Sequence, residues 1–67
     1  MQIKELDPNA IREILKTIDS DETILLSARV NNVEKQWKLG LIDGDTYQLT
    51  LRQINHAAVE LSNKKSH

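Results

Sequence analysis

Apolar side chains recur at helical spacing in three segments of the chain. The first segment predicts a helix over residues 8–18, because Asp7 and Pro8 form an N-cap followed by a first helical residue. Leu6 and Ile11 then occupy the two positions of a hydrophobic staple. The apolar face of this helix, at the spacing i, i+3, i+4, i+7, comprises Ile11, Ile14, Leu15 and Ile18.

A second helix is predicted to begin after Asp19 or Ser20, either of which can cap it, with Glu22 placed as in a capping box. It continues to about Leu39, where Gly40 supplies the left-handed residue that ends many helices. One seam of this helix comprises Leu26, Val30, Val33 and Trp37, and we expect Trp37 to be a core anchor rather than a stacking platform.

Asp43 is the predicted N-cap of a third helix, and Leu41 and Ile42 are expected to tuck the short connection onto the core. The polar residues 62–67 carry no apolar anchor and are expected to fray. The core seam of the third helix comprises Tyr47, Leu51, Ile54, Ala58 and Leu61. Short connections favour antiparallel neighbours, so we predict an all-α fold, a small antiparallel three-helix bundle forming one domain over residues 1–67.

Composition narrows the class of protein. With 67 residues the chain is one domain at most, and its core supplies little stability unless staples or partners help. Cysteine is absent and the net charge is −1, which argues against disulfides, thiolate metal sites and a dedicated nucleic-acid binder. No apolar run is long enough for a membrane span and the first residues do not form a secretory signal, so we expect a soluble cytoplasmic protein.

The second helix also carries apolar residues outside its seam, namely Ile24, Leu25, Ala28 and Leu39. One interpretation is that this helix is central and contacts both neighbours with different faces, as a small bundle requires. The other interpretation is that part of this set is exposed and binds another subunit.

The third helix raises the same question on the face opposite its core seam. Apolar and hydrogen-bonding residues alternate there, a composition that suits a protein interface, although isolated apolar residues on a surface are normal. This outer stripe of the third helix comprises Leu49, Arg52, His56 and Val59.

Catalytic and metal-binding patterns are missing. His56 has only Glu60 as a nearby carboxylate, and such a pair is more often a surface contact than a ligand set. Five acidic residues gather at helix starts, where capping explains them, namely Asp19, Asp21, Glu22, Asp43 and Asp45. We therefore expect no enzymatic activity, no cofactor, no metal and no small-molecule substrate.

The order of several short motifs resembles the effector-associated domains of bacterial conflict systems, specifically the eleventh type. The motifs are LLSAR at residues 25–29, KLGLID at 38–43, Tyr47, and LRQINHAA at 51–58. Asp43 replaces the family's usual serine cap, which preserves capping. Gly44 and Thr46 partly replace the usual acidic residues, which puts a role for acids at that position in doubt.

The resemblance implies a death-like adaptor that brings a sensor together with an effector through like-with-like pairing of helical domains. It singles out Arg29, Arg52 and Asn55 as polar residues. For Arg29 and Asn55 we favour a structural role, whereas Arg52 points outward and is the better interface candidate. The interface residues that we predict are Leu25, Arg29, Leu39, Leu49, Arg52, His56 and Val59.

Two other functions remain open. A small antitoxin-like regulator would bind an unrelated protein, and genomic neighbours carrying a similar helical module would argue against it. Weak nucleic-acid binding through Arg29, Lys35, Lys38 and Arg52 would show steep salt dependence, which the balanced charge makes the weaker interpretation.

Overall fold

The structure is a computed structural model that describes residues 5–65, and within them three helices occur without any strand. Helix α1 spans Pro8–Lys16, α2 spans Glu22–Lys38 and α3 spans Gly44–Lys65. As predicted, the Asp7 carboxylate caps α1 by accepting a hydrogen bond of 2.9 Å from the backbone N–H of Asn9. The helix ends two residues before the predicted Ile18, because Thr17 and Ile18 turn more tightly and donate to carbonyls three residues back.

Helix α2 begins and ends close to its predicted limits. Neither of the two candidate caps is in place, because the N-cap of α2 is Asp21, whose side chain makes no capping hydrogen bond. The Ser20 hydroxyl, one residue earlier, accepts from the backbone N–H of Glu22 at 3.3 Å. At the other end Gly40 has a φ of 78°, in the left-handed region, as expected. The N–H of Gly40 donates to the carbonyl of Trp37 at 3.0 Å and that of Leu41 donates to Gln36 at 2.9 Å. Both bonds of a Schellman motif are therefore present.

Asp43 caps α3 as predicted. Its carboxylate accepts a hydrogen bond of 2.8 Å from the backbone N–H of Thr46. Hydrogen bonding by Thr46 to the ionised carboxylate lowers the pKa of Asp43 below its ordinary value of 3.8. The helix extends to Lys65 and so takes in four of the residues expected to fray. Fraying of residues 62–67 stays a prediction, and residues 66 and 67 lie outside the described part.

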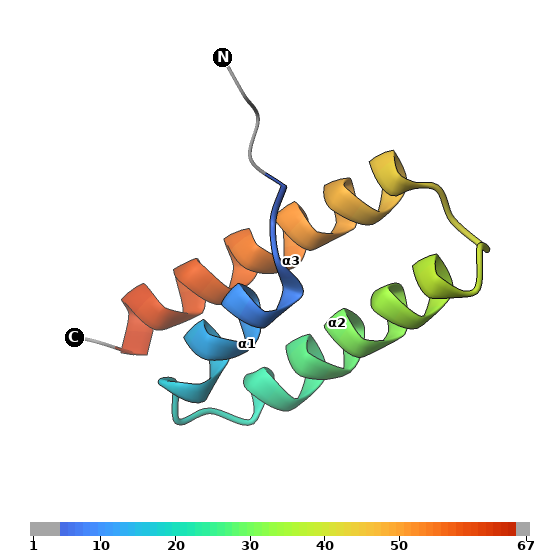
Figure 1. Ribbon diagram of the computed structural model, residues 1–67. Helices are drawn as coiled ribbons and strands as arrows, with labels where there is room; N and C mark the ends of the chain where they lie inside the picture. The colour runs from blue at the N-terminus through green and yellow to red at the C-terminus, as the bar shows by residue number, and fades with distance from the viewer. Residues whose placement is uncertain (1–4, 66–67) are drawn as a thin grey trace, which may run out of the picture.

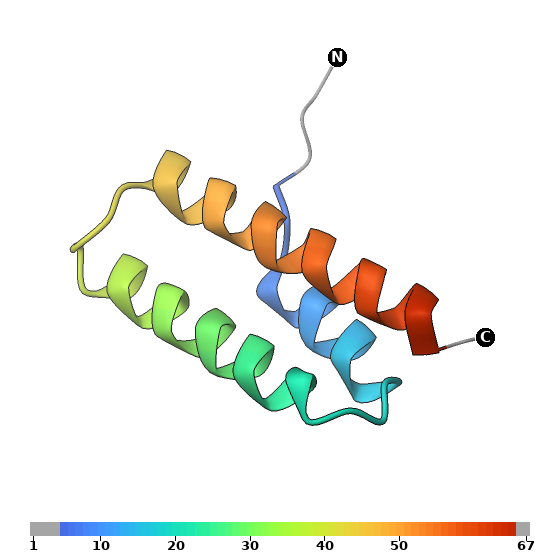
Figure 2. The same ribbon diagram turned by 180° about the vertical axis from the view of Figure 1, so that it is seen from behind.

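The helices alternate in direction, and α1 lies between α2 and α3 in both views (Figures 1 and 2). The shortest extent of the Cα trace is 14 Å. Packed helix axes lie about 8–10 Å apart, and Cα atoms lie about 2.3 Å from each axis. An extent of this size therefore corresponds to two layers, one helix packed on a pair of helices. Helix α1 therefore covers one side of the α2–α3 pair, while the chain described here leaves the other side open.

The core lies between the three helices. It contains the complete predicted seam of α3 and three of the four predicted apolar residues of α1, with Ile14 packed at its margin. The buried residues are Ile11, Leu15, Ile18, Val30, Val33, Tyr47, Leu51, Ile54, Ala58 and Leu61. The all-α three-helix bundle predicted from the sequence is thereby confirmed.

Three expectations about apolar residues were wrong. Leu41 is not tucked onto the core but is 71% exposed, and only Ile42 packs there. Trp37 is 43% exposed, so it is not a fully buried anchor. The additional apolar residues of α2 do not contact the neighbouring helices as a second buried face. Ile24, Leu25, Ala28 and Leu39 are all exposed, because α2 turns mostly polar side chains towards α1.

Candidate interaction surfaces

Large apolar side chains are exposed on α2, on α3 and on the connection between them. Among the described residues none of this exposed set lies on α1. Each member is at least 40% exposed, which is far from the burial of the core. The set comprises Ile24, Leu25, Trp37, Leu39, Leu41, Leu49 and Val59. Single exposed apolar residues are ordinary, but this concentration on two of three helices marks those helices as the candidate binding surface.

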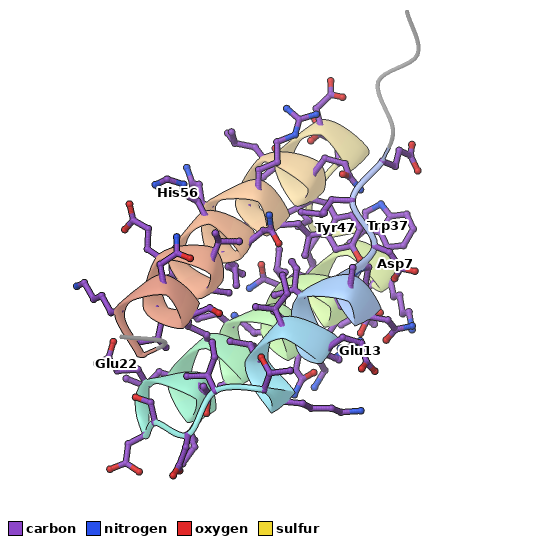
Figure 3. All side chains as sticks on the ribbon, turned by 90° about the vertical axis from the view of Figure 1, so that its left-hand side faces the viewer. Asp7, Glu13, Glu22, Trp37, Tyr47 and His56 are labelled. Carbon is purple, nitrogen blue, oxygen red and sulfur yellow. The ribbon has the colours of Figure 1, made fainter. Side chains whose placement is uncertain are left out.

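The outer stripe of α3 lies where the sequence placed it. Leu49 is 55% exposed and Val59 is 40% exposed, and Arg52 is exposed between them. His56 points away from the bundle, on the side of α3 opposite to Tyr47 (Figure 3). Its Nε2 lies 3.0 Å from a carboxylate oxygen of Glu60, the surface contact anticipated for this pair.

Arg52 makes no ion pair with another residue of the described part. A guanidinium left unpaired beside two exposed apolar side chains can donate bidentate hydrogen bonds to a partner's carboxylate. The outer stripe of α3 therefore combines an apolar surface with an available donor.

Leu25 and Arg29 line a second feature, an open groove of about 460 Å³ between α2 and α3. No α1 residue lines it, which puts it on the side of the helix pair that α1 leaves open. We call it the α2–α3 groove, and its lining residues are Glu22, Leu25, Leu26, Ala28, Arg29 and Ala57.

The polar residues Arg29 and Asn55 were expected to have structural roles. Arg29 is exposed and forms no ion pair with a described residue. Asn55 is half-buried, and within residues 5–65 no side-chain hydrogen bond involves it. The structure therefore gives neither side chain a polar contact that would hold the helices together.

The aromatic pair of the chain lies at the end of the bundle near the α2–α3 connection. The rings of Trp37 and Tyr47 are stacked, with centroids 4.4 Å apart and planes 2° from parallel. Trp37 therefore covers the buried Tyr47 while part of its own indole faces solvent. Burial of the Tyr47 ring, reinforced by the negative charge of Glu34, raises the pKa of the Tyr47 hydroxyl above its ordinary value of 10.0.

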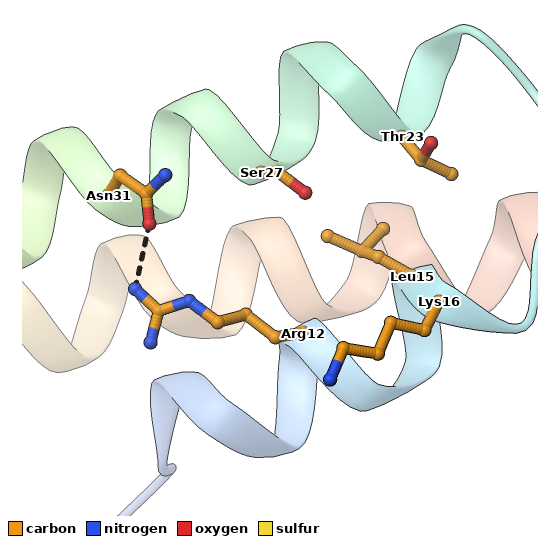
Figure 4. Close-up of a pocket in the computed structure, with 6 residues that line it drawn as sticks. All are labelled: Arg12, Leu15, Lys16, Thr23, Ser27 and Asn31. Carbon is orange, nitrogen blue, oxygen red and sulfur yellow. Dashed lines mark hydrogen bonds between the residues drawn. The ribbon is translucent and has the colours of Figure 1, made fainter.

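Two polar contacts that hold α1 in place were not identified from the sequence. Arg12 donates to Glu34 at 2.7 Å, to Asn31 at 2.8 Å and to Asn9 at 2.9 Å. Figure 4 shows its guanidinium reaching from α1 to Asn31 on α2, along a groove of about 370 Å³ between the two helices. Because the partners of Arg12 all belong to this chain, we assign Arg12 to folding.

The second such contact joins the segment before α1 to α3. The side-chain amide of Gln48 accepts from the backbone N–H of Leu6 at 2.8 Å and donates to its carbonyl at 3.3 Å. The two residues are 42 positions apart, so no local sequence pattern could have indicated this pairing. A single amide side chain thus ties the entry of α1 to the first turns of α3.

The family of the chain follows from a comparison with family models. The family described as effector-associated domain 11 matches residues 3–65, which include all three helices. The chain belongs to this family. The resemblance first indicated by the motifs on α2 and α3 is thereby confirmed. Comparisons with curated proteins and with solved structures gave no significant match.

The effector-associated domain is a small all-helical domain, and its family is not known as a catalytic one. Within residues 5–65, no group of three or more His, Asp or Glu side chains is placed to hold a metal ion. In the same part of the chain, none of the helices combines the length and the apolar character that crossing a bilayer requires. What the geometry does offer is exposed surface of mixed apolar and charged character.

Proposed function

We propose that this effector-associated domain is an adaptor that pairs with a second copy of itself or with an equivalent helical domain on another protein. Through such pairing it couples a sensor to an effector in bacterial conflict and antiviral defence. The observation that carries the proposal is the exposure of seven large apolar side chains on α2, α3 and their connection in so small a domain.

The exposed surfaces have the composition of protein interfaces. Interface cores are enriched in aromatic residues and arginine and are depleted in lysine and acidic residues. The outer stripe of α3 follows this pattern, since Leu49 and Val59 flank Arg52 and His56. In a 67-residue domain, covering such a surface also adds to a core that is small by itself.

Light scattering across a concentration series tests the proposal directly. We expect a mass that rises above the 7.7 kDa of one chain as the concentration increases, or a complex with an equivalent domain encoded nearby. Leu49→Asp and Arg52→Glu, on the outer stripe of α3, should weaken binding of the equivalent domain and leave the circular dichroism spectrum unchanged, because both side chains are exposed.

The matched control is Ala10→Asp, which adds the same carboxylate to an exposed position of α1, the helix without exposed large apolar residues. It should pair like the wild type. A chain that stays monomeric at every concentration and binds no equivalent domain would refute the adaptor. Capture of an unrelated protein by such a monomer would instead support the regulator.

A further inference from the structure

The α2–α3 groove has an apolar centre with one acidic and one basic residue beside it. Leu25 is 69% exposed, and Leu26, Ala28 and Ala57 add further apolar surface. Alanine at two of these positions leaves the helix backbones open to close approach. The groove therefore has the shape and chemistry to receive an amphipathic helix.

Glu22 and Arg29 are both available for a partner. Neither forms an ion pair with a described residue. They are seven residues apart, which puts them within about 20° of the same face of α2 and about 10.5 Å apart along its axis. That separation keeps them from forming a close pair with each other.

The two charges are symmetric about the apolar centre. Glu22 precedes the midpoint between Leu25 and Leu26 by as many positions as Arg29 follows it. A two-fold axis through that midpoint would lay two α2 helices antiparallel and bring Glu22 of each copy opposite Arg29 of the other. An interface between identical subunits around a two-fold axis requires this kind of self-complementarity.

We propose that the α2–α3 groove is the surface through which two copies of this domain pair. Leu25 of each copy lies beside the two-fold axis and packs on Leu26 and Ala57 of the second copy. Two Glu22–Arg29 pairs, one on each side of the axis, fix the antiparallel register. This inference rests on the proposed pairing function and names the surface that performs it.

Charge exchange tests the arrangement. Glu22→Arg alone puts a second arginine opposite Arg29, and Arg29→Glu alone puts two glutamates opposite each other. Because like charges meet twice in each homodimer, each single variant should self-associate about tenfold more weakly than the wild type, or weaker still. The double variant restores opposite charges and should recover the wild-type affinity to within about threefold.

The decisive sample is an equimolar mixture of the two single variants. Its expected mass depends on which charges meet across the two-fold axis.

In the antiparallel register each contact joins position 22 of one copy to position 29 of the other. The Glu22→Arg copy carries arginine at both positions, and the Arg29→Glu copy carries glutamate at both. Both contacts of their heterodimer therefore join an arginine to a glutamate, so the mixture should associate like the wild type although neither variant does so alone. Sedimentation equilibrium measures all these masses.

Two controls accompany the exchange. Lys35→Glu is a charge reversal at an exposed α2 position outside the groove, and it should self-associate like the wild type. Circular dichroism checks that Glu22→Arg, which opposes the helix dipole, keeps its helicity.

The outcomes distinguish an error in the proposed surface from an error in the proposed pairing function. If the wild type and both single variants assemble equally, or if the mixture stays monomeric while the wild type dimerises, this surface is wrong and pairing uses another one. A wild type that remains monomeric overturns both the self-pairing and this surface.

Discussion

Gly40 and Gly44 allow the same substitution to be tested at two positions with opposite expected outcomes. Gly40 ends α2 with a φ of 78°, whereas Gly44 starts α3 without a positive φ. Apart from the adjacent residues and the backbone of the same helix, a Cβ atom added at either glycine would have no heavy atom within 4 Å. The added methyl group therefore clashes with nothing at either position, and the two substitutions differ only in the backbone conformation of the glycine that is replaced.

The expected magnitudes follow from this difference. A non-glycine residue in the left-handed region costs about 1–2 kcal/mol, and alanine recovers about 0.4–1 kcal/mol by restricting the unfolded chain. Gly40→Ala should therefore destabilise the domain by about 1 kcal/mol. Gly44→Ala incurs no such conformational cost and should stabilise the domain by about 0.5 kcal/mol, because alanine is the better helix former.

Thermal unfolding followed by circular dichroism measures both effects. For a domain of this size, a change of 1 kcal/mol shifts the Tm by about 4–8 °C. We expect a lower Tm for Gly40→Ala and a higher Tm for Gly44→Ala. Both variants and the wild type must be compared at one low protein concentration, since pairing raises the apparent stability.

Gly40→Asn is a further control, because asparagine tolerates the left-handed conformation better than alanine does. It should retain part of the stability that Gly40→Ala loses. If both alanine variants shifted the Tm in the same direction, the assignment of Gly40 as the residue that requires a positive φ would be refuted.

Three further predictions concern the Asp43 cap, the Arg12 network and the aromatic pair. Asp43→Asn keeps a capping oxygen but does not titrate. In the wild type the pKa of Asp43 is lowered by folding, so its ionised carboxylate stabilises the fold above the unfolded pKa, and this contribution is lost as the pH falls through the folded pKa. Urea titrations should therefore show the wild type losing stability relative to the variant below about pH 4. Parallel stability curves would contradict this. Arg12→Met should destabilise the domain by about 1–3 kcal/mol in the same assay. The control Lys16→Met removes an exposed ion pair and should cost less than about 1 kcal/mol. Equal losses would show that the Arg12 network adds nothing to the stability of the domain. Trp37→Ala should lower the Tm by more than Trp37→Phe, since phenylalanine can still stack on Tyr47, and indistinguishable melts would mean that the stacking contributes no stability.

Much of the fold follows from local rules. Asp7, Gly40 and Asp43 each have a physical role that depends on a few neighbouring residues, and all three end or begin helices where expected. The α3 seam was predictable in full because each of its residues faces a core on one side only. Helix α2 was harder to predict, because it carries apolar residues on several faces and only Val30 and Val33 among them are buried in the core.

The long-range polar contacts could not have been predicted from the sequence. Arg12 reaches Glu34 and Gln48 reaches Leu6 across separations that no periodic pattern describes. The α2–α3 groove could not be predicted for the same reason, since its residues come from segments far apart in the sequence. Leu25 and Arg29 were identified as interface candidates from the sequence, but their grouping with Ala57 of α3 becomes visible only after the helices are packed.

The central claim is that the open surfaces of α2 and α3 pair with a like domain. Backbone amide chemical shifts, measured by NMR over a wide concentration range, test this claim most directly. We expect shifts around Leu25 that depend on the concentration of the domain, shifts around Leu49 when an equivalent domain is added, and unchanged shifts along α1. A spectrum that does not change with concentration or with an added equivalent domain, or one whose changes centre on α1, would contradict the claim.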